Sequence, residues 1–180
     1  MHRLFVALRP PEAIRDPLID TMEGLDGARW QSDEQLHLTL RFVGEVDRAQ
    51  ANDLVSALQA VRAPGFPLQL RGVGTFARKG RPSALWAGVE RSEPLAILHR
   101  RVERACRAAG LAPETRRFVP HVTIARLNAS TAPVGGWLAT HGRLALPVWQ
   151  VDNFQLFESR LERGGSVYEP VVEFPLAPAD

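Results

Sequence analysis

Cysteine is nearly absent from this 180-residue chain, because Cys106 is the only one. A single cysteine excludes a disulfide within the chain and a zinc site built from several thiolates. The sequence also lacks any apolar run near the roughly 20 residues that a membrane-spanning helix needs. Its apolar N-terminal stretch is too short for a secretory signal and stops at Arg9-Pro10-Pro11. These absences favour a cytoplasmic protein that does not enter a membrane.

Lysine is equally scarce, since Lys79 is the only one among 22 basic residues. An ATP-driven ligase that works through a lysine adduct is therefore disfavoured, and the sequence has no glycine-rich loop of the kind that cradles ATP phosphates. The other basic residues are arginines, whose planar guanidinium groups stay charged and match phosphate oxygens. The net charge is only +2. Composition thus permits an RNA substrate without requiring one.

Hydropathy patterns predict a mixture of strands and helices. The hydrophobic fraction of 45% and the charged fraction of 23% are ordinary for a globular protein of one domain or two small lobes. Strand-like patterns cover residues 4–8, 37–43, 66–73, 84–89, 121–127, 149–157 and 167–174. Helical patterns cover 14–25, 47–61 and 95–109. Short connections favour antiparallel strand pairing, so the expected fold class is α+β.

Two short segments share one pattern, namely His37-Leu38-Thr39-Leu40 and His121-Val122-Thr123-Ile124. In each, a histidine and a threonine alternate with apolar residues inside a strand-like segment. The period of a strand places the histidine and the threonine on one face and the apolar pair on the other. The alternative is that two exposed strands carry these residues by chance, but the matching apolar flanks weaken it.

The paired motifs suit the cleavage of a phosphodiester by in-line displacement. That reaction needs a base on the attacking oxygen and an acid on the leaving oxygen, and a histidine pKa near ~6.5 allows both states. His37 and His121 are therefore the candidate acid and base, and the hydroxyls of Thr39 and Thr123 can donate to phosphate oxygens. For one phosphate to bridge both rings, their facing nitrogens should lie about 5–7 Å apart. Metal ligands at zinc spacing and a nucleophile elbow are both missing from the sequence.

At these residues the chain resembles the two-histidine phosphoesterase superfamily. Within it, the resemblance is to the RNA 2′,3′-cyclic phosphodiesterases, historically called 2′-5′ RNA ligases. It covers nearly the whole chain and is carried by residues 3–7, 29–30, 36–46, 72–76, 81–82, 85–86 and 118–126, with Ser159 and Tyr168 near the end.

This resemblance implies an α+β fold of two similar lobes, with antiparallel sheets facing a central cleft and helices on the outside. Residues 1–180 would form a single bilobal domain with one motif per lobe. The implied reaction is hydrolysis of a terminal 2′,3′-cyclic phosphate to a 2′-phosphate, with no metal or cofactor. His37 would protonate the departing 3′ oxygen and His121 would activate water, while Thr39 and Thr123 hold the phosphate. The expected partner is RNA with a cyclic-phosphate end, or a related cyclic nucleotide, bound by a monomer.

The family pattern also implies a phosphate-contacting arginine at Arg126 and a base-stacking aromatic at Phe42. Each lies five residues past its histidine, so strict alternation points it away, and only a bulge or a strand end would turn it into the cleft. A core position is the alternative for Phe42. Alternation instead places Arg41 on the face of His37, near the phosphate or at the rim of the cleft.

Other functions remain open at this point. The same histidines serve 2′-5′ ligation if a 5′-hydroxyl replaces water. A non-catalytic module that binds RNA ends is a second alternative, and a phosphodiesterase for a cyclic-phosphate metabolite or for 2′-5′ oligonucleotides is a third. Away from the motifs, Trp86 and Cys106 are expected in the core and His99 in a surface or structural position.

Overall fold

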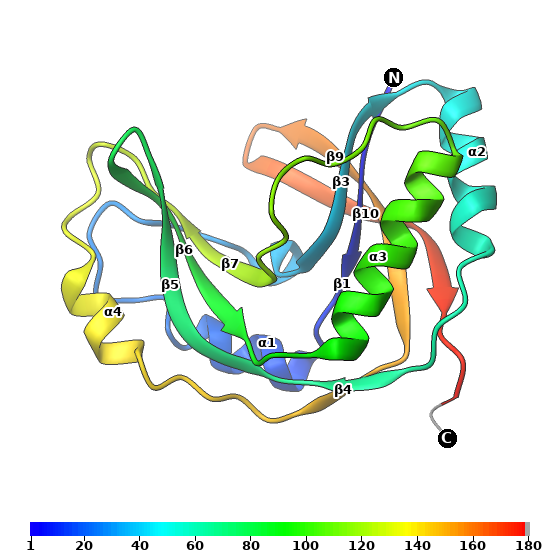
Figure 1. The fold of residues 1–180 in the computed structure, drawn as a ribbon. Coiled ribbons are helices and arrows are strands. Elements are labelled where there is room, and N and C mark those ends of the chain that lie inside the picture. The colour runs from blue at the N-terminus through cyan, green and yellow to red at the C-terminus, as the bar shows by residue number, and fades with distance from the viewer. Residues whose placement is uncertain (179–180) are drawn as a thin grey trace.

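The computed structural model describes residues 1–178 as an α+β protein, as the sequence predicts (Figure 1). The elements in chain order are β1 (His2–Leu8), α1 (Glu12–Ile19), β2 (Arg29–Trp30), the 3-10 helix η1 (Asp33–Gln35), β3 (Leu38–Val46), α2 (Arg48–Gln59), β4 (Phe66–Leu68), β5 (Leu70–Arg78), β6 (Arg81–Val89), α3 (Glu93–Ala108), β7 (His121–Arg126), α4 (Gly135–His141), β8 (Trp149–Val151), β9 (Asn153–Glu162) and β10 (Gly165–Pro175). In this described part, no helix is long and apolar enough to cross a membrane.

An antiparallel sheet runs through the molecule and opens at its middle. Within residues 1–178 it has eight strands in the order β10-β9-β1-β3-β7-β6-β5, with β2 paired to β7. The central strands β3 and β7 meet at a single registered pair, Leu38 with Val122. The sheet therefore divides there into two lobes, which form the two arms seen in Figure 1. The first lobe contains β10, β9, β1 and β3, and the second contains β7, β6, β5 and β2.

Helices cover the outer sides of both lobes (Figure 1). Helices α2 and α3 pack on each other beside the first lobe, and α4 contacts β5 of the second. Each lobe takes segments from both halves of the chain, because β2 of the second lobe lies between β1 and β3 in sequence. One cluster of buried apolar residues includes strands of both lobes. The predicted two-lobed arrangement with helices outside is thus confirmed, and the lobes share a core.

Local sequence signals explain the main helices. The Asp47 side chain accepts a hydrogen bond from the Gln50 backbone N–H at 2.8 Å and thereby caps α2. Helix α3 buries a stripe of residues spaced three and four apart, ending at fully buried Cys106. The first helix, α1, covers Glu12–Ile19 with Pro17 inside it, so it is shorter than the helical pattern of residues 14–25.

Candidate active site

The two His-x-Thr motifs lie side by side where the lobes meet. Continuing the register of Leu38 and Val122 by one residue in each direction places each histidine opposite the threonine of the other motif. All four side chains share the face opposite to these two buried residues. We call this group the His/Thr square: His37, Thr39, His121 and Thr123. The histidines occupy diagonal corners, which on a sheet lie roughly 7–8 Å apart. A single phosphate group fits between two side chains at this spacing.

A β-bulge lies at the last position of each motif. The register of β3 against β1 passes over Leu40, and the register of β7 against β6 passes over Ile124. Leu40 and Ile124 both hold the fourth position of a motif. An extra residue in one strand reverses the alternation of faces beyond it. Arg41 and Phe42 on β3, and Ala125 and Arg126 on β7, therefore face the opposite side from the one that strict alternation predicts.

These bulges turn Phe42 and Arg126 toward the face of the His/Thr square. Phe42 is 38% exposed and lines a cavity together with Thr39 and His121, so the alternative of a core position for Phe42 is wrong. Arg126 is exposed and lies close enough to both histidines to lower their pKa. The bulge that a cleft position of Arg126 requires is thus present.

Arg41 does not share the face of His37, contrary to the prediction from alternation, because the bulge reverses its direction. It is only 7% exposed, and its Nε donates to Glu103 on α3 at 2.6 Å. Its guanidinium also donates to the carbonyl oxygen of Ala112, in the loop between α3 and β7. That loop leads directly to His121. Arg41, on the strand of the first motif, therefore anchors the segment that carries the second.

Each catalytic candidate ring donates a hydrogen bond from Nδ1 to the backbone carbonyl two residues earlier. The distance is 2.6 Å both for His37 to Gln35 and for His121 to Val119. A carbonyl only accepts, so Nδ1 carries a hydrogen in both rings. Nε2 is then the nitrogen available to substrate. It accepts a proton when the ring is neutral and donates one when the ring is charged.

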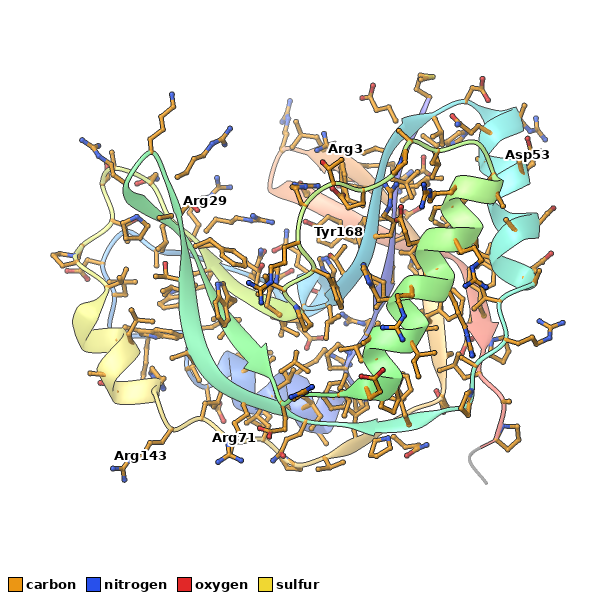
Figure 2. The ribbon with its side chains drawn as sticks, viewed as in Figure 1. Arg3, Arg29, Asp53, Arg71, Arg143 and Tyr168 are labelled. Carbon is orange, nitrogen blue, oxygen red and sulfur yellow. The ribbon has the colours of Figure 1, made fainter. Side chains whose placement is uncertain are left out.

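Aromatic side chains flank both imidazoles. The centroid of the His37 ring lies 4.8 Å from that of Phe5 and 5.2 Å from that of Tyr168. Figure 2 shows Tyr168 in the space between the two lobes. The His121 ring is flanked in the same way by aromatic residues of β5 and β6, at 4.8 and 6.1 Å. These neighbours limit the tilt of each ring and remove water from its sides.

Trp86 is one of the aromatics beside His121, and its predicted place in the core is wrong. The side chain is partly exposed, and its ring lies 5.3 Å from that of Phe76 on the face of the cleft. The indole covers Gly74 so closely that a Cβ at that position would overlap the ring. Glycine at this position thus gives the Trp86 ring room against β5. The glycine at position 74 was the sequence signal that could have placed Trp86 here.

Burial and neighbouring positive charges hold both imidazoles neutral in the free protein. The pKa of His37 is lowered to about 4, with desolvation by burial as the largest cause and the charges of Arg126, His121 and Arg9 as smaller ones, while the hydrogen bond to the Gln35 carbonyl acts in the opposite direction. Burial, followed by Arg126, also lowers the pKa of His121. A bound phosphate acts in the opposite direction, because its negative charge favours the protonated imidazole. The charged ring that acid catalysis needs is therefore favoured by substrate.

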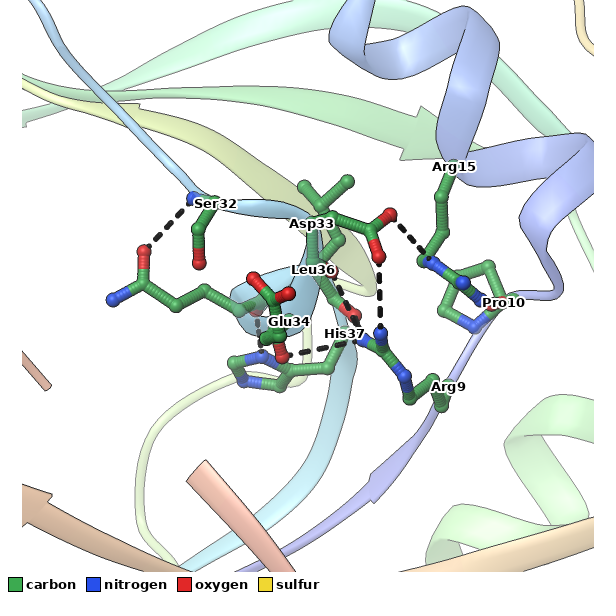
Figure 3. Close-up of polar contacts among 9 residues, drawn as sticks. Arg9, Pro10, Arg15, Ser32, Asp33, Glu34, Leu36 and His37 are labelled. Carbon is green, nitrogen blue, oxygen red and sulfur yellow. Dashed lines mark hydrogen bonds and ion pairs between the residues drawn. The ribbon is translucent and has the colours of Figure 1, made fainter. Parts of the chain in front are cut away.

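The turn before His37 is held in place by Arg9 (Figure 3). Nη1 of Arg9 donates at 2.9–3.2 Å to three backbone carbonyls of this turn, those of Asp33, Glu34 and Leu36. Arg15 donates to the Asp33 carboxylate at 2.9 Å from the other side. The Gln35 carbonyl, which orients the His37 ring, lies within the segment fixed in this way. Arg9 is thus a positioning residue that the sequence patterns did not reveal.

Of the cavities in the described part of the chain, two lie at opposite ends of the His/Thr square. The first has a volume of about 540 Å³ and lies at the end of Thr39 and His121. His99 lines it with its ring stacked on Phe118, 3.8 Å between centroids, so this histidine faces the cleft. The second, of about 490 Å³, lies at the end of Arg126, between β2, η1 and β10. A substrate with groups on both sides of its phosphate has room at both ends.

Comparison with known proteins gives a match to one family over most of the chain. The model of the 2′-5′ RNA ligase superfamily matches residues 10–162. An RNA 2′,3′-cyclic phosphodiesterase of Aeropyrum pernix is 35% identical over 148 residues, which cover 81% of this chain and 84% of that protein. Another from Thermotoga maritima is 31% identical, with coverage of 95% and 94%.

Solved structures share the fold. The Thermus thermophilus protein TT0787 has a TM-score of 0.82 at 28% identity, covering 99% of this chain and 100% of that one. Escherichia coli LigT in complex with 3′-AMP has a TM-score of 0.80 at 27% identity, covering 97% and 98%. The similarity therefore extends over both lobes.

Proposed function

This chain belongs to the 2′-5′ RNA ligase superfamily, and we propose that it hydrolyses a 2′,3′-cyclic phosphate at an RNA end to a 2′-phosphate. The main support is the pair of histidines at diagonal corners of the His/Thr square. In each of them Nδ1 is hydrogen-bonded to the backbone and Nε2 is available to substrate. The names of the Aeropyrum and Thermotoga relatives support the substrate class. The complex of LigT with 3′-AMP supports a nucleotide as the ligand.

In this proposal the cyclic phosphate lies over the His/Thr square. The hydroxyls of Thr39 and Thr123 donate to its non-bridging oxygens and stabilise the charge that develops there. One Nε2 takes a proton from the attacking water while the other gives a proton to the ribose 3′ oxygen, so the P–O3′ bond breaks and the 2′-phosphate remains. Arg126 offers a further donor to the phosphate. Phe42, exposed beside the square, offers a surface on which a base stacks.

The division of roles between the histidines is part of the proposal. We assign His37 as the acid and His121 as the base. Because the pKa of His37 is about 4 in the free protein, His37 must gain its proton when the substrate phosphate is bound. The phosphate raises that pKa by its charge and by screening Arg126. Residues 1–180 are proposed to act as one bilobal domain, with one motif from each lobe.

Product analysis tests the proposed reaction. An oligonucleotide ending in a 2′,3′-cyclic phosphate is expected to yield a terminal 2′-phosphate, with full activity in excess EDTA, because two histidines supply both proton transfers. Phosphorus NMR of the product identifies the phosphate position. Among residues 1–178, no three His, Cys, Asp or Glu side chains gather as metal ligands do. Activity that is lost in EDTA and restored by zinc, or a 3′-phosphate product, contradicts the proposal.

The same assay separates the alternative functions. A binding module leaves the cyclic phosphate intact over hours. A 2′-5′ ligase joins an added oligonucleotide with a 5′-hydroxyl to the cyclic end. Both outcomes are visible as distinct bands after electrophoresis.

The pH dependence of turnover is expected to be bell-shaped, because one histidine must be neutral and the other protonated. The pKa of each free histidine lies below its usual 6.5, so the maximum of kcat/KM should fall below that pH. The maximum of kcat should lie at higher pH, because bound phosphate raises both pKa values. Initial rates from pH 4 to 9, at limiting and saturating substrate, measure the two profiles.

The variant Arg126→Gln tests the cause of the low histidine pKa values. Arg126 lowers the pKa of both histidines, so its removal should move the kcat/KM profile of the variant toward higher pH. If turnover by the wild-type protein does not change between pH 4 and 9, the histidines are not the groups that transfer the protons.

A further inference from the structure

Two arginines lie directly opposite each other beside the His/Thr square. Arg29 on β2 is paired in register with Arg126 on β7, so their side chains share one face. Both are exposed, and like charges in this position repel each other. Within residues 1–178, neither forms an ion pair with a carboxylate. An anion between the two guanidinium groups would convert this repulsion into attraction.

Both arginines line the second cavity, of about 490 Å³. Figure 2 shows Arg29 in the second lobe and Tyr168 across the opening in the first. Hydrogen bonds fix the wall between them: Gln35 accepts from the Ser32 N–H at 3.0 Å and donates to the Ser166 carbonyl at 2.8 Å. Gln35 thereby ties the turn before the first motif to the β9–β10 hairpin. The cavity therefore lies between the two lobes and has a wall held in place by hydrogen bonds.

This cavity adjoins the reacting groups. The Tyr168 ring, which lines it, contacts the His37 ring, and Gln35 supplies the carbonyl that orients His37. Arg126 lies between the His/Thr square and the cavity: its charge acts on both histidines, and its side chain lines the cavity. A chain of phosphates that places one group over the His/Thr square therefore brings the next one toward Arg29.

We propose that Arg29 and Arg126 form a second phosphate subsite, which binds the RNA phosphate next to the reacting one. The inference rests on the proposed function and adds that the protein binds an oligonucleotide end more tightly than a cyclic mononucleotide. Two guanidinium groups offer several donors in planar arrays, which suit the tetrahedral oxygens of a phosphodiester. Two sources supply this group: the strand that ends in the cyclic phosphate, and an incoming strand with a 5′-hydroxyl.

Kinetics with matched substrates test the subsite. The substrates are adenosine 2′,3′-cyclic phosphate, the dinucleotide ApA with the same cyclic end, and that dinucleotide with an uncharged methylphosphonate linkage. Wild-type protein is expected to show a KM about tenfold lower for the charged dinucleotide than for the other two, the scale of one charge-assisted hydrogen bond. In Arg29→Gln this advantage should shrink to less than about twofold. Arg143→Gln, which removes the same charge from an exposed position away from the cleft, should keep it.

A second arm identifies the source of the phosphate. ApA with a free 5′-hydroxyl and no cyclic end is tested as an inhibitor of adenosine 2′,3′-cyclic phosphate hydrolysis. A higher inhibition constant in Arg29→Gln assigns the subsite to the incoming strand, and a loss confined to the cyclic dinucleotide assigns it to the strand that carries the cyclic end. If Arg29→Gln changes neither the inhibition constant of ApA nor the KM of the cyclic dinucleotide, Arg29 does not form a phosphate subsite and the proposal is wrong.

Failure of the proposed function has a different signature. It appears as absent turnover of every cyclic phosphate by wild-type protein. Calorimetry with ApA then still decides the subsite, through the affinity of wild-type protein compared with Arg29→Gln and Arg143→Gln. If wild-type protein, Arg29→Gln and Arg143→Gln bind ApA with equal affinity, the proposed subsite is wrong.

Discussion

Alanine at His37 or at His121 is expected to lower kcat for a cyclic-phosphate oligonucleotide by about a hundredfold or more, the scale for losing a general acid or base. Each ring is the sole carrier of one proton transfer in the proposed mechanism. The double variant should fall little further than either single variant, because groups that act as a unit are not additive. Initial rates at saturating substrate measure these effects.

The control is His141→Ala, which removes a histidine of α4 outside the cleft. Circular dichroism and thermal unfolding establish that each variant is folded. Added imidazole is expected to restore part of the activity of the alanine variants, since it fills the space of the missing ring. Turnover like that of wild type in a folded His37→Ala or His121→Ala protein would remove that residue from the mechanism.

Replacing Arg41 with methionine is expected to lower the free energy of unfolding by about 3 kcal/mol, the lower end for breaking a buried ion pair, because it leaves the mostly buried Glu103 carboxylate without its cationic partner. Glu103 is 18% exposed and loses the 2.6 Å bond from Arg41 Nε, and the Ala112 carbonyl loses a donor. The loop before His121 is then less well held, so kcat should also fall. Urea unfolding and initial rates measure the two effects.

A surface ion pair on the same helix provides the comparison. Arg100→Met breaks an exposed contact with Glu93 at 3.5 Å and should cost less than about 1 kcal/mol. In the double variant Arg41→Met/Glu103→Met, part of the lost stability should return, since the unpaired carboxylate is gone. A cost for Arg41→Met as small as that for Arg100→Met would show that the buried pair does not anchor the loop.

The motif positions could be predicted because they depend on local geometry. In a strand, alternate side chains share a face whatever the partner strand is, so His37 and Thr39 had to lie together once Leu38 was buried. The same holds for His121 and Thr123. The helix cap at Asp47 is equally local, because side chain and backbone are three residues apart. Such features need no knowledge of distant contacts.

The directions of Phe42, Arg41 and Arg126 could not be predicted in this way. A bulge is a property of two paired strands, and the sequence of β3 or β7 alone reads as a regular strand. The extra residues at Leu40 and Ile124 become visible only against β1 and β6. Arg41, expected near the phosphate or at the rim of the cleft, is consequently buried against α3, although it still lines the first cavity.

Local patterns in the sequence are enough to identify two histidine and threonine pairs on strand faces, in an α+β fold with little capacity for thiolate or lysine chemistry. The folded chain was needed to show that the pairs form one square, that Arg9 holds the turn before His37, and that Arg29 lies opposite Arg126. These outcomes depend on the register between strands and on hydrogen bonds between segments far apart in the chain. Residue type and local periodicity leave both undetermined, because the same strand pattern satisfies many registers until a partner strand selects one.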